Sequence, residues 1–204
     1  MKNIYTEGSN SNLVIMLHGS GEDEKSLIEV AKYIDQNASV LGIKGNVSEN
    51  GINRFFRRFR PGVFDIDNLI EETKNLYGFI SEFIKENGFT EDNIVIIGYS
   101  NGANILGSML YHYGKISNGA VLMHPMIPIK NFPVANQNEG KILITSGIND
   151  PLVSNSETND LVNILSQAGG EVIHLSFSEG HSLSLTELNE IKKWYNKLYK
   201  SILR

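Results

Sequence analysis

Three side chains in separate segments of the sequence are of the types that carry out acyl transfer, and the first is a serine. Ser100 lies in the run Gly98-Tyr99-Ser100-Asn101-Gly102, which has the form G-x-S-x-G of a nucleophile elbow. In such a turn the glycines let neighbouring backbone approach closely, and the serine hydroxyl stands exposed above a sheet. The alternative is a glycine–serine turn that only caps a helix. The Ile/Val run before Ser100 and the helical pattern after it favour the nucleophile.

A histidine is needed next to take the proton of the serine, and the chain contains five histidines. His181 follows the last predicted strand and completes the order Ser, Asp, His along the chain. Its small neighbour Gly180 leaves room for the ring to reach the serine. The other four lie in a strand, in a helix, ahead of the acid or in the first loop: His174, His112, His124 and His18. We interpret His18 as a structural residue that binds loop backbone.

The third side chain is a carboxylate that orients the histidine. The loop Gly147-Ile148-Asn149-Asp150-Pro151 follows a predicted strand and presents one carboxylate beside a turn-forming proline. Asp150 is therefore the candidate that holds the imidazole of His181, and a simple turn aspartate is the alternative. Asp92 precedes a strand and so lies at the wrong end of the sheet, whereas Asp160 lies inside a predicted helix. We interpret both as surface carboxylates.

An acyl-transfer site also needs two N–H groups that stabilise the negatively charged oxygen of the tetrahedral intermediate. The loop His18-Gly19-Ser20-Gly21 follows the first predicted strand. The backbone N–H of Ser20 in this loop and that of Asn101, directly after the serine, form the obvious pair. We therefore predict an oxyanion hole built from Ser20 and Asn101.

Arginines and phenylalanines alternate over residues 54–60. The interpretation that we favour is a short amphipathic turn, whose phenylalanines pack inward while its arginines are solvated or paired with acidic neighbours. The alternative is a substrate-facing wall, with rings against an acyl or aryl group and an arginine near an anionic one. The candidate substrate contacts in that case are Phe56, Arg57, Phe64 and Met126.

These segments must be positioned by a regular framework, and the sequence predicts strands that alternate with helices. The expected strands are short, β-branched and apolar, and the last one suits a sheet edge: Leu13–Leu17, Ser39–Gly42, Asn93–Gly98, Gly119–Met123, Lys141–Thr145 and Glu171–Phe177. The expected helices show one apolar face each: Glu24–Asn37, Asp67–Asn87, Asn101–Tyr113, Glu157–Ala168 and Ser184–Lys200. The alternation predicts an α/β fold, with a mainly parallel sheet covered by helices on both faces. Active residues in such a sheet lie beyond the carboxyl ends of the strands, where the candidate loops fall.

Composition narrows the classes of function. The 204 residues suit a single domain over 1–204 with no separate lid domain. A formal net charge of -5 gives no positive field that would attract nucleic acid. The absence of cysteine excludes disulfides, thiolate metal sites and a cysteine nucleophile. The start Met1–Gly8 is too polar for a signal peptide, and no apolar run is long enough to span a membrane, so we expect a cytoplasmic protein.

The whole chain resembles the phospholipase/carboxylesterase family of small α/β-hydrolases, which includes acyl-thioesterases and lysophospholipases. The resemblance rests on the serine elbow and on four further segments: Leu17-His18-Gly19-Ser20-Gly21, His124-Pro125-Met126, Gly147-Ile148-Asn149-Asp150-Pro151 and Gly180-His181. It implies the α/β-hydrolase fold and a site that needs neither a metal nor another cofactor.

Two further features of this resemblance bear on the substrate. The segments Phe56–Phe59 and Gly62–Asp65 resemble a bacterial branch often found with quinone- or hydroquinone-responsive genes, which implies small aromatic or short-chain esters. Ser20 stands where many acyl-thioesterases of the family carry leucine, and Asn101 stands where they commonly carry glutamine. Specificity for long-chain acylated proteins is therefore not expected.

The sequence thus predicts a serine carboxylesterase that hydrolyses small carboxylic esters through an acyl-enzyme on Ser100. An acyl-thioesterase or a lysophospholipase with the same three residues is the alternative, because these residues do not encode the leaving group. A ligand-binding protein without catalysis is a rival from another class, but it would be expected to lose one of the three. The expected partner is a small-molecule ester, and a homodimer is compatible with the sequence.

Overall fold

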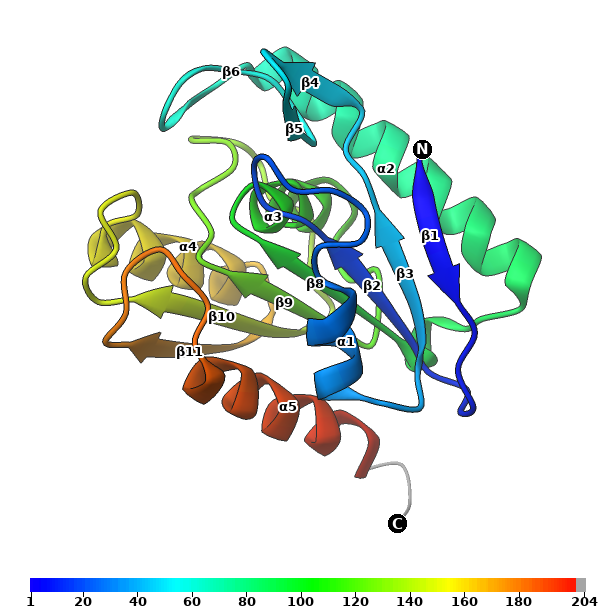
Figure 1. The fold of residues 1–204 in the computed structure, drawn as a ribbon. Coiled ribbons are helices and arrows are strands. Elements are labelled where there is room, and N and C mark those ends of the chain that lie inside the picture. The colour runs from blue at the N-terminus through cyan, green and yellow to red at the C-terminus, as the bar shows by residue number, and fades with distance from the viewer. Residues whose placement is uncertain (201–204) are drawn as a thin grey trace.

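Seven strands form the central sheet of the structure, a computed structural model that describes residues 1–200. In chain order they are β1 (Asn3–Thr6), β2 (Leu13–Leu17), β3 (Ser39–Ile43), β8 (Ile94–Tyr99), β9 (Gly119–Met123), β10 (Lys141–Gly147) and β11 (Glu171–Phe177). Their order across the sheet is β1-β3-β2-β8-β9-β10-β11 (Figure 1). Strand β1 is antiparallel to β3, and the other neighbours are parallel. The predicted mainly parallel sheet is therefore confirmed.

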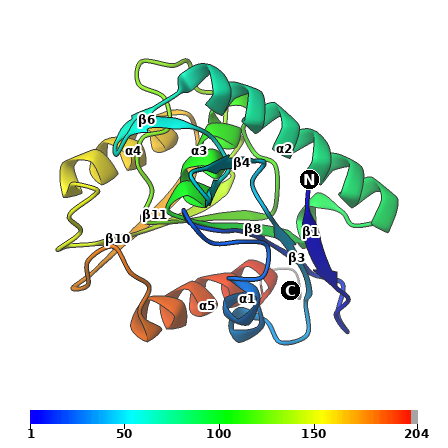
Figure 2. The same ribbon diagram turned by 45° about the horizontal axis from the view of Figure 1, so that its top comes forward.

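Helices cover both faces of this sheet. They are α1 (Ile28–Ile34), α2 (Ile66–Asn87), α3 (Asn101–Tyr113), α4 (Asn155–Gln167) and α5 (Leu185–Lys200), and a short 3-10 turn spans Glu91–Asn93. Figure 2 shows α1 and α5 on one face and α2, α3 and α4 on the other. Such an arrangement buries the sheet from both sides, as the nearly continuous apolar character of the strands requires.

Strand β2 shows how one strand contributes to both layers of the core. Leu13, Ile15 and Leu17 pack in the cluster formed with α2, α3 and α4. Val14 and Met16 pack in the cluster formed with α1 and α5. Because successive side chains of a strand point to opposite faces, all five are buried. The carboxyl end of β2 is thereby held firmly between its neighbours β3 and β8.

The six predicted strands and five predicted helices all occur, with small differences in their bounds. Strand β1 was not predicted, because it is a polar edge strand with mostly exposed side chains. Helix α1 is shorter than expected, since the chain before Ile28 forms turns instead. Among the described residues, no helix is both long and apolar enough to cross a bilayer.

The expectation of an amphipathic turn over residues 54–60 is wrong. This region forms two antiparallel ribbons, one from β4 (Val47–Glu49) and β5 (Ile52–Arg54), the other from β6 (Arg58–Arg60) and β7 (Val63–Phe64). Phe55 and Phe56 are buried in the core, as expected, but Phe59 is 75% exposed. Phe55 and Phe56 lie in the link between β5 and β6, which packs on the core, whereas Phe59 lies within β6 on a ribbon that projects from it.

Candidate active site

Ser100 occupies the sharp turn between β8 and α3. Its φ of 51° is a value that residues with a β-carbon rarely adopt. The Ser100 N–H donates to the carbonyl of Met123, and its carbonyl accepts from the N–H of Asn104, both at 2.9 Å. A β-carbon on Gly98 would collide with the backbone of Gly102, and one on Gly102 would collide with the end of β2. The surrounding backbone thus holds Ser100 in a strained turn, as a nucleophile elbow requires.

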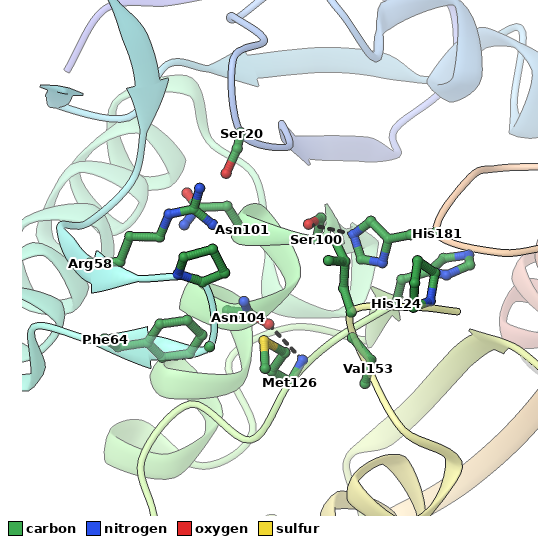
Figure 3. Close-up of a pocket in the computed structure, with 14 residues that line it drawn as sticks. Ser20, Arg58, Phe64, Ser100, Asn101, Asn104, His124, Met126, Val153 and His181 are labelled. Atoms are coloured by element: carbon green, nitrogen blue, oxygen red, sulfur yellow. Dashed lines mark hydrogen bonds between the residues drawn. The ribbon is translucent and has the colours of Figure 1, made fainter. Parts of the chain in front are cut away.

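Ser100, His181 and Asp150 form a continuous chain of contacts. Nε2 of His181 lies 2.8 Å from Oγ of Ser100 (Figure 3). Nδ1 of the same ring lies 2.7 Å from Oδ2 of Asp150. The three residues follow β8, β11 and β10 respectively, so three separate loops at the carboxyl edge of the sheet bring them together. This is the geometry of a serine, histidine and aspartate triad.

The carboxylate of Asp150 is held in place by backbone N–H groups that follow it in its own loop. Its Oδ1 accepts the backbone N–H groups of Leu152 at 2.8 Å and Val153 at 3.1 Å. Burial acts to raise the pKa of Asp150, but the Leu152 N–H and the contacts with His181 and His124 outweigh it and lower that pKa. Asp150 is therefore ionised at neutral pH, with Oδ2 directed at the His181 ring.

The two residues predicted to form the oxyanion hole line the same cavity as Ser100. Ser20 follows β2. Asn101 is the first residue of α3, a position where the N–H has no acceptor within the helix. The side chain of Asn101 is buried and accepts the N–H of Phe55 at 2.7 Å. Its Oδ1 is therefore engaged by the backbone of Phe55, and the oxyanion hole of Ser20 and Asn101 N–H groups stays a prediction.

A cavity of about 260 Å³ lies over Ser100, and we call it the Ser100 cavity. Its lining residues come from the loops after five strands, from the start of α3 and from the β6–β7 ribbon (Figure 3): Ser20, Arg58, Pro61, Gly62, Phe64, Ser100, Asn101, Asn104, His124, Met126, Pro151, Leu152, Val153 and His181. The backbone N–H of Met126 donates to Oδ1 of Asn104 at 2.7 Å, which fixes this wall to α3.

Two of the four predicted substrate contacts line this cavity, namely Phe64 and Met126. The other two do not. Phe56 is fully buried and packs edge-on against Phe64, with ring centroids 5.0 Å apart. Arg57 exposes 54% of its side chain and pairs with Asp65 at 3.0 Å. The next residue in the extended chain, Arg58, takes the position at the cavity, because successive side chains alternate.

His124 and Glu187 complete a buried network that the sequence did not predict. His124 follows β9 with a φ of 53°, and its ring is fully buried. Its Nδ1 lies 3.2 Å from Oδ2 of Asp150, and its Nε2 lies 3.3 Å from Oε2 of Glu187. Burial acts to lower the pKa of His124, but the contacts with Glu187 and then Asp150 outweigh it and raise that pKa. From the sequence, His124 was set aside as a base, and the run His124-Pro125-Met126 indicated only part of the family resemblance.

The donor atoms of His124, Asp150 and His181 all lie within 4.8 Å of one another, a spacing that could hold a metal ion. Asp150 is already shared between the Nδ1 atoms of both rings. A histidine must also lose a proton before it can bind a metal, and the raised pKa of His124 opposes that loss. We interpret these residues as a hydrogen-bond network rather than a metal centre.

A second serine–histidine pair is present away from the cavity. Oγ of Ser146 lies 2.8 Å from Nε2 of His174, and these residue types are consistent with a triad. The two residues lie on the adjacent strands β10 and β11. In the described part of the chain, the side-chain partners of His174 are Ser146 and Ser176, with no carboxylate among them. Ser100 and His181 are therefore the better candidates for chemistry.

The remaining candidates lie where structural roles are sufficient. Nδ1 of His18 lies 2.7 Å from the carbonyl oxygen of Gly19, and its Nε2 accepts the N–H of Gly45 at 3.1 Å. His18 therefore binds loop backbone on both sides. Asp92 is exposed in the 3-10 turn before β8, and Asp160 is exposed on α4.

Comparison with known proteins places the chain among esterases. The family model described as phospholipase/carboxylesterase matches residues 4–199. MhqD of Bacillus subtilis (strain 168) is 36% identical over 197 residues, which cover 97% of this chain and 98% of that protein. The crystal structure of the Bacillus cereus carboxylesterase is 42% identical with a TM-score of 0.94, covering 98% of this chain and 95% of that one.

A third relative agrees with these two. The structure of YahD with malic acid is 26% identical with a TM-score of 0.90, and covers 97% of this chain and 98% of that one. The resemblance found in the sequence motifs is thus confirmed over nearly the whole length. The chain belongs to the phospholipase/carboxylesterase family, and it is a serine hydrolase of the α/β-hydrolase fold.

Proposed function

We propose that the protein is a serine carboxylesterase that hydrolyses small carboxylic esters, short-chain or aryl, through an acyl-enzyme on Ser100. The observation that carries this proposal is the chain of contacts from Ser100 Oγ to His181 at 2.8 Å and from His181 to Asp150 at 2.7 Å. Ser100 and His181 line the Ser100 cavity, where a substrate can reach them. In this proposal Ser100 is the nucleophile, His181 is the general base, and Asp150 orients the histidine.

In the first half of the reaction, Nε2 of His181 takes the hydroxyl proton of Ser100 as Oγ attacks the ester carbonyl carbon. The carbonyl oxygen becomes negatively charged, and the backbone N–H groups of Ser20 and Asn101 stabilise it. The intermediate collapses as the C–O bond to the leaving alcohol breaks. The alcohol oxygen takes the proton from Nε2, which leaves an ester on Ser100.

In the second half, a water replaces the alcohol. His181 removes one proton from this water as its oxygen attacks the acyl carbon, and the same N–H groups hold the oxyanion. The bond to Ser100 Oγ then breaks, and Oγ regains the proton from His181. Asp150 keeps Nδ1 of His181 protonated throughout, so that Nε2 is the nitrogen that exchanges protons.

The dimensions of the cavity support a small substrate. A volume of about 260 Å³ lies just below the range of about 300 to 1,000 Å³ that is typical of ligand sites. The relative YahD has been solved with malic acid, a compound of a size that such a cavity holds. The aromatic ring of Phe64 and the thioether of Met126 provide apolar surface for a short acyl or aryl group.

The alternatives within enzymes are an acyl-thioesterase and a lysophospholipase, which would use the same residues. The hydrolysis rates of an ester and a thioester of the same acyl group would distinguish a carboxylesterase from an acyl-thioesterase. A silent ligand-binding protein is disfavoured, because Ser100, His181 and Asp150 are retained in mutual contact.

Labelling with an active-site-directed fluorophosphonate tests the assignment of the nucleophile. Such a reagent reacts with a serine that a neighbouring base activates. We expect one adduct on the peptide that contains Ser100, and none in Ser100→Ala. Ser146→Ala is the matched control, because Ser146 has the other serine–histidine contact, and it should label as the wild type does. Labelling of Ser100→Ala at the wild-type rate, or an adduct on Ser146, would refute the proposal.

A further inference from the structure

Arg58 brings a permanent positive charge to the Ser100 cavity, and ester hydrolysis by itself gives it no role. In Figure 3 its side chain extends into the cavity from β6, while the contact between Ser100 and His181 lies on the other side. Among the described residues that line this cavity, none is an aspartate or a glutamate. The walls of this cavity therefore offer the guanidinium group no carboxylate to pair with.

The neighbouring arginines differ from Arg58 in this respect. Nη1 of Arg54 lies 3.0 Å from Oε2 of Glu49, and Nε of Arg57 lies 3.0 Å from Oδ2 of Asp65. The side chain of Arg58 forms no ion pair or hydrogen bond within the part of the chain that the structure describes. Burial first, and repulsion from Arg54 second, lower the pKa of Arg58 more than attraction to Glu49 raises it, and an anion beside the guanidinium would relieve both lowering effects.

Local structure holds Arg58 at this position. Within the β6–β7 ribbon, Arg58 pairs with Phe64, whose ring packs against the buried Phe56. The preceding Arg57 donates its N–H to Oδ1 of Asn68 at 2.8 Å, and its carbonyl accepts the N–H of Asp65 at 3.1 Å. The ribbon is thus bound to the first turn of α2, so the guanidinium group is presented by a fixed backbone.

We infer that Arg58 forms a carboxylate-binding subsite, and that the substrates of this esterase are small esters that also carry a carboxylate. A guanidinium group binds a carboxylate through two parallel N–H···O bonds, which fixes the position of the ligand as well as neutralising it. The ester carbonyl would then lie at Ser100 while the anionic group lies at Arg58. This inference rests on the proposed esterase function and names its substrate class.

The test compares esters that differ only in charge. On the acyl side, monoethyl succinate is compared with its neutral carboxamide, ethyl succinamate. On the alcohol side, 4-acetoxybenzoate is compared with 4-acetoxybenzamide. In each pair the ratio of kcat/KM for the anionic ester to that for the neutral ester is measured by titration of released acid. We expect this ratio to exceed about tenfold in one of the two pairs, because an ion-paired hydrogen bond contributes about that much.

The variants Arg58→Gln and Arg60→Gln then separate the subsite from general charge. Arg60 is exposed on the same ribbon and does not line the cavity. The ratio should fall to about unity in Arg58→Gln and stay within about twofold of the wild type in Arg60→Gln. A wild-type ratio near unity in both pairs, or an unchanged ratio in Arg58→Gln, would overturn the inference.

A binding measurement keeps this result separate from the proposed function. Succinate has no ester bond, so its affinity, measured by calorimetry, does not depend on catalysis. We expect binding to the wild type and to Ser100→Ala, with a loss of about tenfold in Arg58→Gln. If fluorophosphonate labelling and neutral ester hydrolysis fail while succinate still binds through Arg58, the esterase proposal is wrong and the subsite remains. If succinate binds the wild type and Arg58→Gln alike, the subsite is wrong.

The buried contact between His124 and Glu187 carries a second, independent inference. Ionised carboxylates can only accept hydrogen bonds. His124 lies between two of them, with Nδ1 at Asp150 and Nε2 at Glu187. A neutral imidazole has a single N–H and can satisfy only one of the two contacts, whereas an imidazolium satisfies both.

The surroundings favour this charged form. Both carboxylates and the His124 ring are about 1% exposed or less, so each charge needs a partner within the protein. The other titratable groups that face the ring are His181, with ring centroids 5.3 Å apart, and Tyr99, at 5.9 Å. Oε1 of Glu187 has no hydrogen-bond partner among the described residues, which leaves His124 as the main counterion of that carboxylate.

The geometry points to Glu187 and His124 as positioning residues: Glu187 keeps His124 doubly protonated, and His124 donates its Nδ1–H to Oδ2 of Asp150. Oδ2 then accepts from His124 and His181 together, while Oδ1 accepts from the Leu152 and Val153 N–H groups. The carboxylate that orients His181 is thus fixed by four donors. Neither Glu187 nor His124 touches the reacting atoms.

Histidine NMR and kinetics test this second inference together. Spectra of protein labelled with 15N in its histidines should show both ring nitrogens of His124 still protonated above pH 6.5, the ordinary pKa of a histidine. In Glu187→Gln, which is nearly isosteric, the His124 titration should move to lower pH. We expect kcat to fall about tenfold in His124→Gln with KM little changed, since Asp150 loses a charged donor. His174→Asn, which alters the other serine–histidine pair, is the control.

The double variant distinguishes a shared role from separate structural effects. If Glu187 acts through His124, the loss in kcat for both changes together should be no larger than that for His124→Gln alone. Thermal unfolding shows whether each variant remains folded. A singly protonated His124 in the wild type, or a titration unchanged by Glu187→Gln, would overturn the inference. So would fully additive losses in kcat.

Discussion

The hydroxyl of Tyr99 donates a hydrogen bond of 3.0 Å to the main-chain carbonyl of His181, a residue that is 82 positions away in the chain. Tyr99 directly precedes Ser100 at the end of β8. The bond therefore ties the loop of the proposed base to the strand that carries the proposed nucleophile. Burial raises the pKa of Tyr99 to about 12, so its hydroxyl remains a donor across the pH range of ester hydrolysis assays.

Tyr99→Phe should lower kcat by several-fold, about threefold to tenfold, and change KM little. The variant keeps the ring and loses one neutral hydrogen bond, which contributes about 1 kcal/mol. The His181 loop would then sample positions in which Nε2 is displaced from Ser100. Steady-state kinetics with one p-nitrophenyl ester checks this. An unchanged kcat would mean that the loop is positioned without Tyr99.

Ser100→Ala should fold normally and retain only residual hydrolysis. Related triads lose on the order of 10⁶ in turnover when the nucleophile is removed. Circular dichroism and thermal unfolding would establish that the fold is intact, and single-turnover assays would measure the loss. A variant that kept a tenth of wild-type activity would show that Ser100 is not the nucleophile.

Asp150→Asn should lower kcat by about 10⁴, because the neutral amide no longer selects the tautomer of His181 in which Nε2 accepts the serine proton. The matched control is Asp160→Asn, on the exposed face of α4. It should be close to wild type. Reversed sensitivities of the two variants would move the orienting acid elsewhere.

The elements that position Ser100 were predictable because their signals are local. Strands such as β2 are continuous apolar runs, and the glycines of the elbow lie beside Ser100 in the sequence. The order of Ser100, Asp150 and His181 along the chain then selected one histidine among five. Strand β1 gave no such signal, since its exposed side chains follow no buried pattern.

The parts of the site that sequence could not predict depend on contacts between distant residues. Glu187 lies in the first turn of α5, where a glutamate is usually exposed to solvent. In the structure it is fully buried and contacts His124, 63 positions away. The choice between Arg57 and Arg58 depends on which side of an extended ribbon faces Ser100. Only the pairing of β6 with β7 and their attachment to α2 determine that side.

The network around His124 should make stability depend on pH in a particular direction. Burial acts to lower the pKa of His124, but Glu187 and Asp150 outweigh it and raise that pKa above its ordinary value of 6.5. A group whose pKa is raised on folding stabilises the fold fully below its unfolded pKa, and this contribution is lost as pH rises through the folded value. Asp150, whose pKa is lowered, remains ionised throughout this range.

The free energy of unfolding of the wild type should therefore exceed that of His124→Gln most at about pH 5.5, and the difference should shrink above the raised pKa of His124. Urea unfolding at a series of pH values measures it. Burial lowers the pKa of His174, so His174→Gln should show the opposite trend and gain relative stability as pH falls. The same slope in both variants would contradict the charged network.

The size of the Ser100 cavity leads to a prediction about acyl length. At about 260 Å³ it has room for a short chain, and the described connection between β9 and β10 contains no helix that would extend it into a tunnel. Acyl carbons add rate only where apolar contacts meet them in the transition state, so acyl groups of about two to six carbons should give the highest kcat/KM. A series of p-nitrophenyl esters below their micelle-forming concentrations tests this. Met126→Ala, which widens one wall, should move the optimum to longer chains, whereas a wild-type kcat/KM that climbs steadily to about sixteen carbons would favour a lysophospholipase or an acyl-thioesterase.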